Sequence, residues 1–226
     1  MKTNYEGHEN VYRARRASGK PGWQDEESLR RTLSALASKM SGPHAPRSGR
    51  VLELGCGAGD LSLWLAAAGY EVHGVDISPT AVEWARQKAA DRGLSARFSV
   101  GSVLESGELV PGSFDMVLDG YCFHCIVGAD RALFLANARR LLKPGGVLHV
   151  ATMCGPVTSP VLQARFDPDA RCMLDGDGNA TRYIGLAESI VGEIRDAGLL
   201  VRDWSVTPRR DEAREMDELL VWATRG

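Results

Sequence analysis

A glycine-rich loop placed directly after a short apolar run is the feature that most constrains how this chain can fold. The run R-V-L-E-L at residues 50–54 leads into G-C-G-A-G-D, and a segment with helical spacing follows from Asp60. Gly55, Gly57 and Gly59 carry no Cβ, so the backbone can turn sharply there and approach a ligand closely. A helix N-terminus after such a turn presents free N–H groups. The sequence therefore predicts a strand, a ligand-binding turn and a helix in succession.

Strand-like and helical patterns alternate from this loop to the C-terminus. Four further apolar runs are interpreted as strands, at residues 70–76, 96–103, 113–120 and 146–153. Strands that alternate with helices form right-handed crossovers and a mostly parallel sheet with helices on both faces. The last two runs, residues 199–208 and 217–225, have only a short polar connection between them. We therefore predict an α/β fold that ends in an antiparallel hairpin at the edge of the sheet.

Two segments fall outside this alternation. Residues 1–48 contain one amphipathic helical pattern, at residues 25–40, and a linker rich in glycine and proline. The basic run Y-R-A-R-R-A-S-G-K is followed at once by acidic residues, which favours a solvated surface. Residues 153–184 show no regular pattern apart from G-D-G-N at residues 176–179, which predicts a tight turn.

Charge and composition argue against several kinds of partner. The chain has 27 basic and 29 acidic residues, a net charge of −2, and so lacks the basic excess that nucleic-acid phosphates require. No apolar run approaches the ~20 residues of a membrane helix, and the start of the chain lacks the apolar core of a secretory signal. Five cysteines do not suggest a disulfide framework. We expect a cytoplasmic protein that binds neither nucleic acid nor membrane.

The spacing of the glycine loop distinguishes between two kinds of nucleotide ligand. A nicotinamide-nucleotide site needs G-x-G-x-x-G, but Asp60 occupies the third glycine position, and an acid there would repel a pyrophosphate. The spacing is instead E-x-G-x-G-x-G, beginning at Glu53. This pattern closely resembles the first motif of the class I S-adenosylmethionine-dependent methyltransferases. The cofactor of that family carries an ammonium and a sulfonium group, so nearby acids are favourable.

The resemblance extends over roughly residues 50–224 and implies a Rossmann-like, seven-stranded, mostly parallel sheet with an antiparallel last strand. It also implies that Asp76, at the end of the second strand, accepts hydrogen bonds from the ribose hydroxyls. Ser102 stands where the family often has an aspartate against adenine, and the Val103 backbone could hold the ring edge. The cofactor contacts implied in this way come from Glu53, Gly55, Gly57, Gly59, Asp76, Ile77, Ser102, Val103 and Asp119. L-L-K-P-G-G at residues 141–146 is a further, structural hallmark of the family.

The stretch D-G-Y-C-F-H-C at residues 119–125 allows two chemical interpretations. Cys122, His124 and Cys125 could be ligands of a zinc ion, with Cys154 or Cys172 completing the set. Those two cysteines lie apart, however, and provide no second C-x₂-C pair. We therefore predict no metal site.

The alternative interpretation is catalytic. The stretch follows the fourth strand, where the family places the reacting centre, and Asp119 corresponds to a residue that faces the methionine part of the cofactor. His124 is the natural general base for an amine or phenol nucleophile, and the Tyr121 ring or hydroxyl could lie near the sulfonium. Structural roles remain open for both: His124 could pack beneath the cofactor or cap the next helix, and Tyr121 could be plain pocket wall. No covalent cysteine is needed.

The two irregular segments are candidates for covering the site. In similar small methyltransferases an N-terminal segment folds over the cofactor, so residues 1–48 are expected to be a helical lid and linker, unless Trp23 only anchors a surface helix. Residues 49–226 would be the S-adenosylmethionine-binding methyltransferase domain, with residues 153–184 as a substrate-cap insertion. Arg171 and Arg182 could suit a substrate carboxylate. The expected substrate contacts are Tyr12, Trp23, Cys122, Cys154, Arg182 and Tyr183.

The expected function is methyl transfer from S-adenosylmethionine to a small molecule. Thiols or other soft nucleophiles and N- or O-nucleophiles are both open as acceptors; cysteines at the carboxyl ends of the strands suit the former. The signature D/N-P-P-Y of nucleic-acid methylation is replaced by D-G-Y-C. One alternative is an enzyme that cyclises the cofactor's own amino-acid chain to a small ring and releases methylthioadenosine. Another is a non-catalytic cofactor-binding or metal-binding protein.

Overall fold

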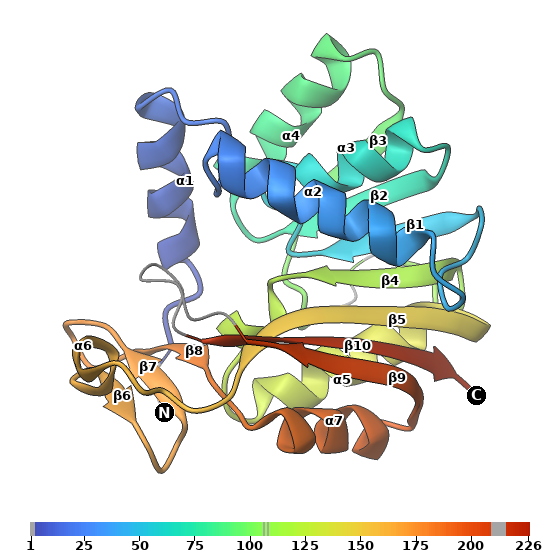
Figure 1. The fold of residues 1–226 in the computed structure, drawn as a ribbon. Coiled ribbons are helices and arrows are strands. Elements are labelled where there is room, and N and C mark those ends of the chain that lie inside the picture. The colour runs from blue at the N-terminus through green and yellow to red at the C-terminus, as the bar shows by residue number, and fades with distance from the viewer. Residues whose placement is uncertain (1–2, 106, 108, 209–215) are drawn as a thin grey trace.

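A seven-stranded sheet forms the centre of the molecule in the computed structural model, which describes residues 3–105, 107, 109–208 and 216–226 (Figure 1). In spatial order its strands are β3 (Ala96–Val100), β2 (Glu71–Asp76), β1 (Arg50–Leu54), β4 (Phe114–Gly120), β5 (Leu142–Cys154), β10 (Asp217–Arg225) and β9 (Leu199–Thr207). Strands β3, β2, β1, β4 and β5 pair in parallel, and β10 is antiparallel to both β5 and β9. The predicted Rossmann-like α/β fold with an antiparallel last strand is thus confirmed.

Helices cover both faces of this sheet (Figure 1). On one face lie α2 (Glu26–Met40), α3 (Asp60–Ala67) and α4 (Pro79–Asp91), and on the other lie α5 (Asp130–Leu141) and α7 (Ala187–Asp196). The largest apolar cluster packs α5 and α7 against β1, β4 and β5. Local signals place the helix ends: the side chain of Ser78 accepts a hydrogen bond from the Ala81 amide, and Pro79 begins α4. The order of the strands reverses between β1 and β4, which is where such sheets bind ligands.

One helix was not anticipated. Helix α1 (Gly7–Ala17) includes most of the basic run that the sequence suggested was only a solvated surface. Its buried residue is Tyr12, and its apolar residues are too few to form a clear stripe. Tertiary contacts hold it instead: Glu9 accepts hydrogen bonds from the Ser78 hydroxyl at 2.6 Å and from the Thr80 hydroxyl at 2.7 Å, at the start of α4.

The segment after β5 contains regular structure where we expected none. It holds the short helix α6 (Pro160–Gln163) and a three-stranded antiparallel sheet of β6 (Phe166–Asp167), β7 (Cys172–Leu174) and β8 (Ala180–Tyr183), which we call the cap. Strands of two to four residues are too short to show alternation in the sequence. The predicted turn is present, because Asp175 accepts hydrogen bonds from the amides of Asp177 and Asn179. Thr3 forms an isolated parallel bridge with Ala180 of β8.

Candidate active site

A cavity of about 760 Å³ opens at the carboxyl ends of the parallel strands. Its walls come from the glycine loop after β1, the loop after β4, the N-terminal segment with α1, the start of α2, the cap and the start of β10. The cavity therefore lies at the position where the fold predicts a ligand site.

The glycine loop forms the floor of the cavity in a conformation that only glycine tolerates well. Gly55 and Gly57 have φ values of 73° and 53°, in the left-handed region that side chains disfavour. A Cβ on Gly55 would lie 2.5 Å from the Cys122 Cβ, and a Cβ on Gly57 would overlap the Tyr12 hydroxyl. The loop is held by Val75, whose carbonyl accepts hydrogen bonds from the amides of residues 55 and 56. These glycines thus let Cys122 and Tyr12 pack directly against the loop, whose backbone lines the cavity.

Two buried carboxyl groups line the cavity beside this loop. Asp76 accepts hydrogen bonds from the Gly57 amide at 2.8 Å and the Ser78 amide at 2.9 Å, and burial raises its pKa although these bonds lower it. Glu53 accepts a hydrogen bond from the Ser62 hydroxyl at 2.5 Å, and burial raises the pKa of Glu53 to about 8. Each carboxyl group retains acceptor capacity for a ligand that offers hydroxyl groups or positive charge.

The remaining residues that the sequence assigned to the cofactor divide into two groups. Ile77, Ser102 and Val103 line the same cavity as the glycine loop. Gly59 lies outside its wall and packs against Ala85 of α4, where an added Cβ would come within 2.8 Å.

Asp119 is fully buried behind the cavity wall. Its Oδ1 accepts hydrogen bonds from the amides of Cys122 and Phe123, both at 2.8 Å, while its Oδ2 has no hydrogen-bond partner among the described residues. Burial raises the pKa of Asp119 to about 7. The side chain therefore shapes the loop after β4 from behind.

Tyr121 enters the cavity from that loop with an unusual backbone conformation. Its φ is 70°, a left-handed value that is uncommon for a bulky side chain and tends to occur at functional sites. Its hydroxyl donates a hydrogen bond to the carboxylate of Glu218, which lies on β10 opposite Met153 of β5. Glu218 was not predicted as a site residue. The sequence carries no local signal for it, because the register of β10 against β5 brings it into the cavity.

His124 is buried and lines the cavity. Burial lowers its pKa to about 3, and the nearby Arg182 guanidinium adds to the effect. The ring is therefore neutral near pH 7, and its Nδ1 has no hydrogen-bond partner in the part of the chain that the structure describes. The sequence suggested a base with a pKa close to neutrality, but this environment lowers the pKa of His124 well below that. The base role of His124 therefore stays a prediction.

The five cysteines occupy different surroundings, and none forms a disulfide. Cys122 and Cys125 line the cavity, and burial raises the pKa of both thiols, that of Cys125 to about 11. Cys154 lies in the apolar core, and Cys172, on strand β7 of the cap, packs with Val127 and Ala180. Within the described residues, no group of three or more His, Cys, Asp or Glu side chains is arranged to hold a metal ion.

The N-terminal segment closes one side of the cavity. Tyr12 and Trp23 lie with ring centroids 5.4 Å apart, and His8 lies 5.8 Å from Trp23; all three line the cavity. His8 was not anticipated from the sequence. Its position depends on α1, whose packing over the glycine loop the sequence did not indicate.

The cap contributes Arg182, but its neighbour Tyr183 faces elsewhere. The Tyr183 ring lies 4.1 Å from the guanidinium carbon of Arg131, outside the cavity wall. Arg171 binds the backbone: its Nε donates to the Ile184 carbonyl and its Nη2 to the Gly155 carbonyl, both at 2.8 Å. Met153 and Met216, which the sequence did not suggest, complete the apolar wall.

No helix in the described part of the chain is long and apolar enough to cross a membrane.

Comparison with known sequences identifies the region around the glycine loop. A family model described as a methyltransferase domain matches residues 51–146. The chain is 30% identical over 201 residues to the ubiquinone biosynthesis O-methyltransferase of Xanthomonas axonopodis pv. citri, covering 85% of this chain and 82% of that protein. It is 36% identical over 132 residues to the ribosomal RNA small subunit methyltransferase C of Alcanivorax borkumensis. That match covers 57% of this chain and only 39% of the relative's length.

Solved structures share the fold over almost the whole chain. One, reported for the conversion of a disulfide bond into a thioacetal group during echinomycin biosynthesis, is 26% identical with a TM-score of 0.68 and covers 98% of this chain and 92% of its own. Another is the 1,6-didemethyltoxoflavin-N1-methyltransferase of Burkholderia thailandensis with bound S-adenosylhomocysteine. It is 21% identical with a TM-score of 0.70, and the match covers 100% of this chain and 92% of that chain.

Proposed function

The chain belongs to the class I S-adenosylmethionine-dependent methyltransferases, and we propose that its acceptor is a small molecule bound in the cavity between the glycine loop and the cap. S-Adenosylmethionine is the cofactor of this enzyme. The observation that carries the proposal is the continuity of the cavity: Asp76 and Glu53 at the glycine loop line the same cavity as Arg182 of the cap.

The residues present fit the cofactor. When bound, it supplies a methyl group activated by a sulfonium. Gly55 and Gly57 place backbone without side chains on the cavity wall, and Cys122 and Tyr12 pack directly against it. We assign Asp76 to the ribose hydroxyls and Glu53 to the positively charged amino-acid end, because both are buried carboxyl groups with acceptor capacity left. Ile77, Ser102 and Val103 would hold the adenine end.

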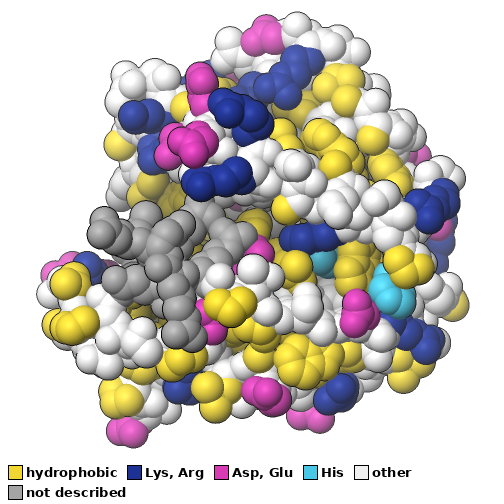
Figure 2. Space-filling model, in the orientation of Figure 1, with side chains coloured by type: hydrophobic (Ala, Val, Ile, Leu, Met, Phe, Trp, Pro, Cys, Tyr) yellow, Lys and Arg dark blue, Asp and Glu magenta, His cyan; other side chains and the backbone are white. Residues whose placement is uncertain are grey.

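We call the side of the cavity formed by the cap and by Tyr121 the acceptor half, and its dimensions suit a small-molecule acceptor. The whole cavity, which would hold cofactor and acceptor together, has a volume of about 760 Å³, within the ~300–1,000 Å³ range of small-molecule sites. Residues 1–48, as lid and linker, and residues 153–184, as cap, would exclude water from the reacting centre. Basic and acidic side chains are interspersed over the face in Figure 2, as expected from the net charge of −2, and do not favour an RNA acceptor.

Both classes of nucleophile retain support from specific residues. The sulfur-rich wall of Cys122, Cys125, Met153 and Met216 suits a thiol or another soft acceptor. The similarity to the protein of echinomycin biosynthesis, which acts where a disulfide becomes a thioacetal, points the same way. An N- or O-acceptor would instead use Tyr121: its proton is engaged by Glu218, so its oxygen can accept a hydrogen bond from the acceptor. The five free cysteines support a reducing, cytoplasmic location.

A labelled-cofactor assay tests the proposal. Purified protein is incubated with methyl-labelled S-adenosylmethionine and, separately, with panels of thiols, amines and phenols and with small-subunit ribosomal RNA; both products are identified by mass spectrometry. S-Adenosylhomocysteine together with a methylated small molecule supports the proposal. Methylation of the RNA alone would overturn the small-molecule acceptor. Methylthioadenosine without any methylated acceptor would favour cyclisation instead.

A further inference from the structure

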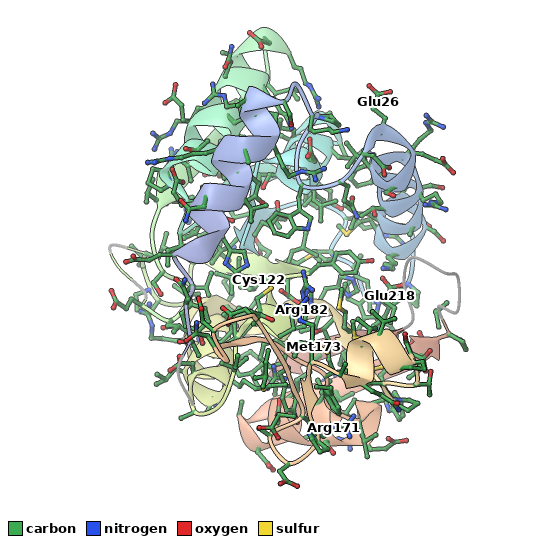
Figure 3. All side chains as sticks on the ribbon, turned by 90° about the vertical axis from the view of Figure 1, so that its left-hand side faces the viewer. Glu26, Cys122, Arg171, Met173, Arg182 and Glu218 are labelled. Atoms are coloured by element: carbon green, nitrogen blue, oxygen red, sulfur yellow. The ribbon has the colours of Figure 1, made fainter. Side chains whose placement is uncertain are left out.

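Arg182 is placed in the acceptor half of the cavity by the alternation of the cap strand β8. Directly opposite Arg182 on β7 is Met173, and directly opposite Tyr183 is Cys172. Because successive side chains of a strand point to opposite faces, Arg182 and Met173 share one face of the cap and Tyr183 and Cys172 share the other. Figure 3 shows Arg182 rising from the cap toward Cys122, whereas Arg171 lies farther down in the cap.

The guanidinium of Arg182 has no carboxylate partner within the part of the chain that the structure describes. No ion pair or backbone hydrogen bond joins it to any described residue, in contrast to Arg171, which donates to two carbonyl groups. Its neighbours are the His124 ring and the Cys125 thiol. The guanidinium lowers the pKa of both groups: it adds to the effect of burial on His124 and partly offsets the effect of burial on Cys125. A guanidinium that faces a cavity without an ion pair to a described residue is well placed to bind an anion there.

The other residues of the cavity wall indicate the charge and polarity of the anion that could bind. The other arginine of the cavity wall, Arg15, donates through Nε to the Gly22 carbonyl at 2.5 Å, and no lysine lines the cavity wall among the described residues. Asp25, Asp217 and Glu218 line the same cavity, whose described wall carries more acidic than basic side chains. Among the described wall residues, one arginine on the cap beside several acids favours a single negative charge over two. The wall between them is apolar, with contributions from Met153, Leu162 and Met216.

We propose that Arg182 is the specificity-determining residue for the acceptor, and that the acceptor is a small apolar molecule carrying one carboxylate, which pairs with this guanidinium. The planar guanidinium can donate two parallel hydrogen bonds to a carboxylate. The apolar body of the acceptor would pack on the methionines and leave its nucleophilic atom directed to the glycine-loop side. This inference rests on the proposed small-molecule function and names its substrate class.

A binding experiment tests the inference without requiring turnover. The protein is loaded with S-adenosylhomocysteine and titrated by calorimetry with matched probes: benzoate against benzamide, and 4-mercaptobenzoate against 4-mercaptobenzamide. Each acid should bind about 10- to 100-fold more tightly than its amide, as expected for hydrogen bonds to a charged group. Arg182→Gln should remove that preference, and Arg182→Lys should retain part of it. Arg165→Gln is the matched control, because Arg165 is exposed on the cap, does not line the cavity and donates to the Leu174 carbonyl.

Several outcomes would overturn the inference. Equal binding of acids and amides, or binding of neither, would show that the cavity does not select a carboxylate. Tighter binding of phenyl phosphate than of benzoate would show that the site prefers a dianion to a carboxylate. A weaker affinity of Arg182→Gln for S-adenosylhomocysteine itself would assign the residue to the cofactor. The melting temperature of Arg182→Gln should match that of the parent, which separates lost binding from lost folding.

The inference and the proposed function can fail independently. If carboxylates bind through Arg182 but no tested acceptor is methylated, the acid site stands and the methyl-transfer proposal falls. If neutral thiols or phenols are methylated as efficiently as their acids, by kcat/KM, the methyl-transfer proposal stands and the carboxylate assignment falls.

Discussion

The hydroxyl of Tyr121 donates a hydrogen bond to the carboxylate of Glu218, joining the loop after β4 to the start of β10 across the cavity. The left-handed backbone of Tyr121 directs the ring to this partner. Two residues 97 positions apart in sequence therefore form one polar unit on the wall where the acceptor would react.

Tyr121→Phe keeps the ring and removes the hydroxyl of that unit. If the hydroxyl positions or deprotonates the acceptor, kcat should fall by about 10²-fold, with little change in the KM for the cofactor. Glu218→Gln should cause a similar loss, and the double variant should lose little more, because the two residues act together. Steady-state kinetics of the three variants check this. Unchanged kcat in Tyr121→Phe would reduce the ring to pocket wall.

His124 should not produce an ionisation near pH 6.5 in the activity profile. Burial, with a further contribution from Arg182, lowers its pKa to about 3, so it is neutral from pH 5 to pH 9. The pH dependence of kcat should therefore have the same shape in the parent and in His124→Gln. If the parent shows a limb near pH 6.5 that His124→Gln lacks, the ring is the titrating base after all.

Cofactor binding should release a proton from Glu53. Burial raises the pKa of Glu53 to about 8, so it is mostly protonated at pH 7, and a cation bound beside it would favour the ionised form. Calorimetric titration with S-adenosylhomocysteine, which retains the ammonium group, should give enthalpies that vary with the ionisation enthalpy of the buffer. The release should approach one proton per site at pH 7 and disappear in Glu53→Gln. A buffer-independent enthalpy would contradict the assignment.

The same pKa also affects folding. A carboxyl group that is more basic in the folded state contributes stability that is present below its unfolded pKa, 4.5, and is lost as the pH rises toward about 8. Without cofactor, Glu53→Gln should therefore become more stable relative to the parent from pH 5 to pH 8. The slope should reach at most about 1.4 kcal/mol per pH unit. Urea unfolding at several pH values measures this difference in the free energy of unfolding.

Gly57→Ala should disrupt the cofactor site beyond the cost of backbone strain. The new Cβ would overlap the Tyr12 hydroxyl and would hold a residue with a φ of 53°. Gly69→Ala is the matched control, because Gly69 has a φ of 94° but no atom within 4 Å of its added Cβ. Both should lose about 1–2 kcal/mol of stability from strain, but only Gly57→Ala should weaken S-adenosylhomocysteine binding. Equal affinities of the two variants for S-adenosylhomocysteine in calorimetry would show that the Tyr12 side chain moves aside without weakening the site.

Glu9→Ala should loosen α1 from the protein. The Glu9 carboxylate accepts hydrogen bonds from Ser78 and Thr80, and despite burial, which raises it, these bonds lower the pKa of Glu9 to about 2. Hydrogen exchange of α1 amides should become faster, and S-adenosylhomocysteine should dissociate faster, because Tyr12 and His8 are carried by this helix. Glu6→Ala, just before α1, makes no side-chain cap and serves as the control. Equal exchange in the two variants would contradict the anchoring role.

The parts of the site that could be predicted are those that local sequence determines. The glycine loop and Asp76 follow their strands directly, so spacing alone identified the segments, and both line the cavity. Glu218 could not be found in this way, since only the register of β10 against β5 brings it to Tyr121.

Other differences come from elements that tertiary contacts stabilise. Helix α1 has a weak apolar pattern and depends on Glu9 and Tyr12. In the cap, strand β8 has only four residues, too few for the sequence to show which side chains face the cavity. The sequence therefore could not distinguish the position of Arg182 from that of Tyr183. The structure places one in the cavity and the other against Arg131.

The bridge between Thr3 and Ala180 ties the beginning of the chain to the strand that carries Arg182. The same N-terminal segment continues into α1, which lies over the glycine loop. A single cover thus spans both halves of the cavity, and opening one end disturbs the other. The enzyme should therefore follow an ordered kinetic sequence, in which the cofactor enters first and its spent form departs last, with a residence time set by the cover rather than by the chemistry.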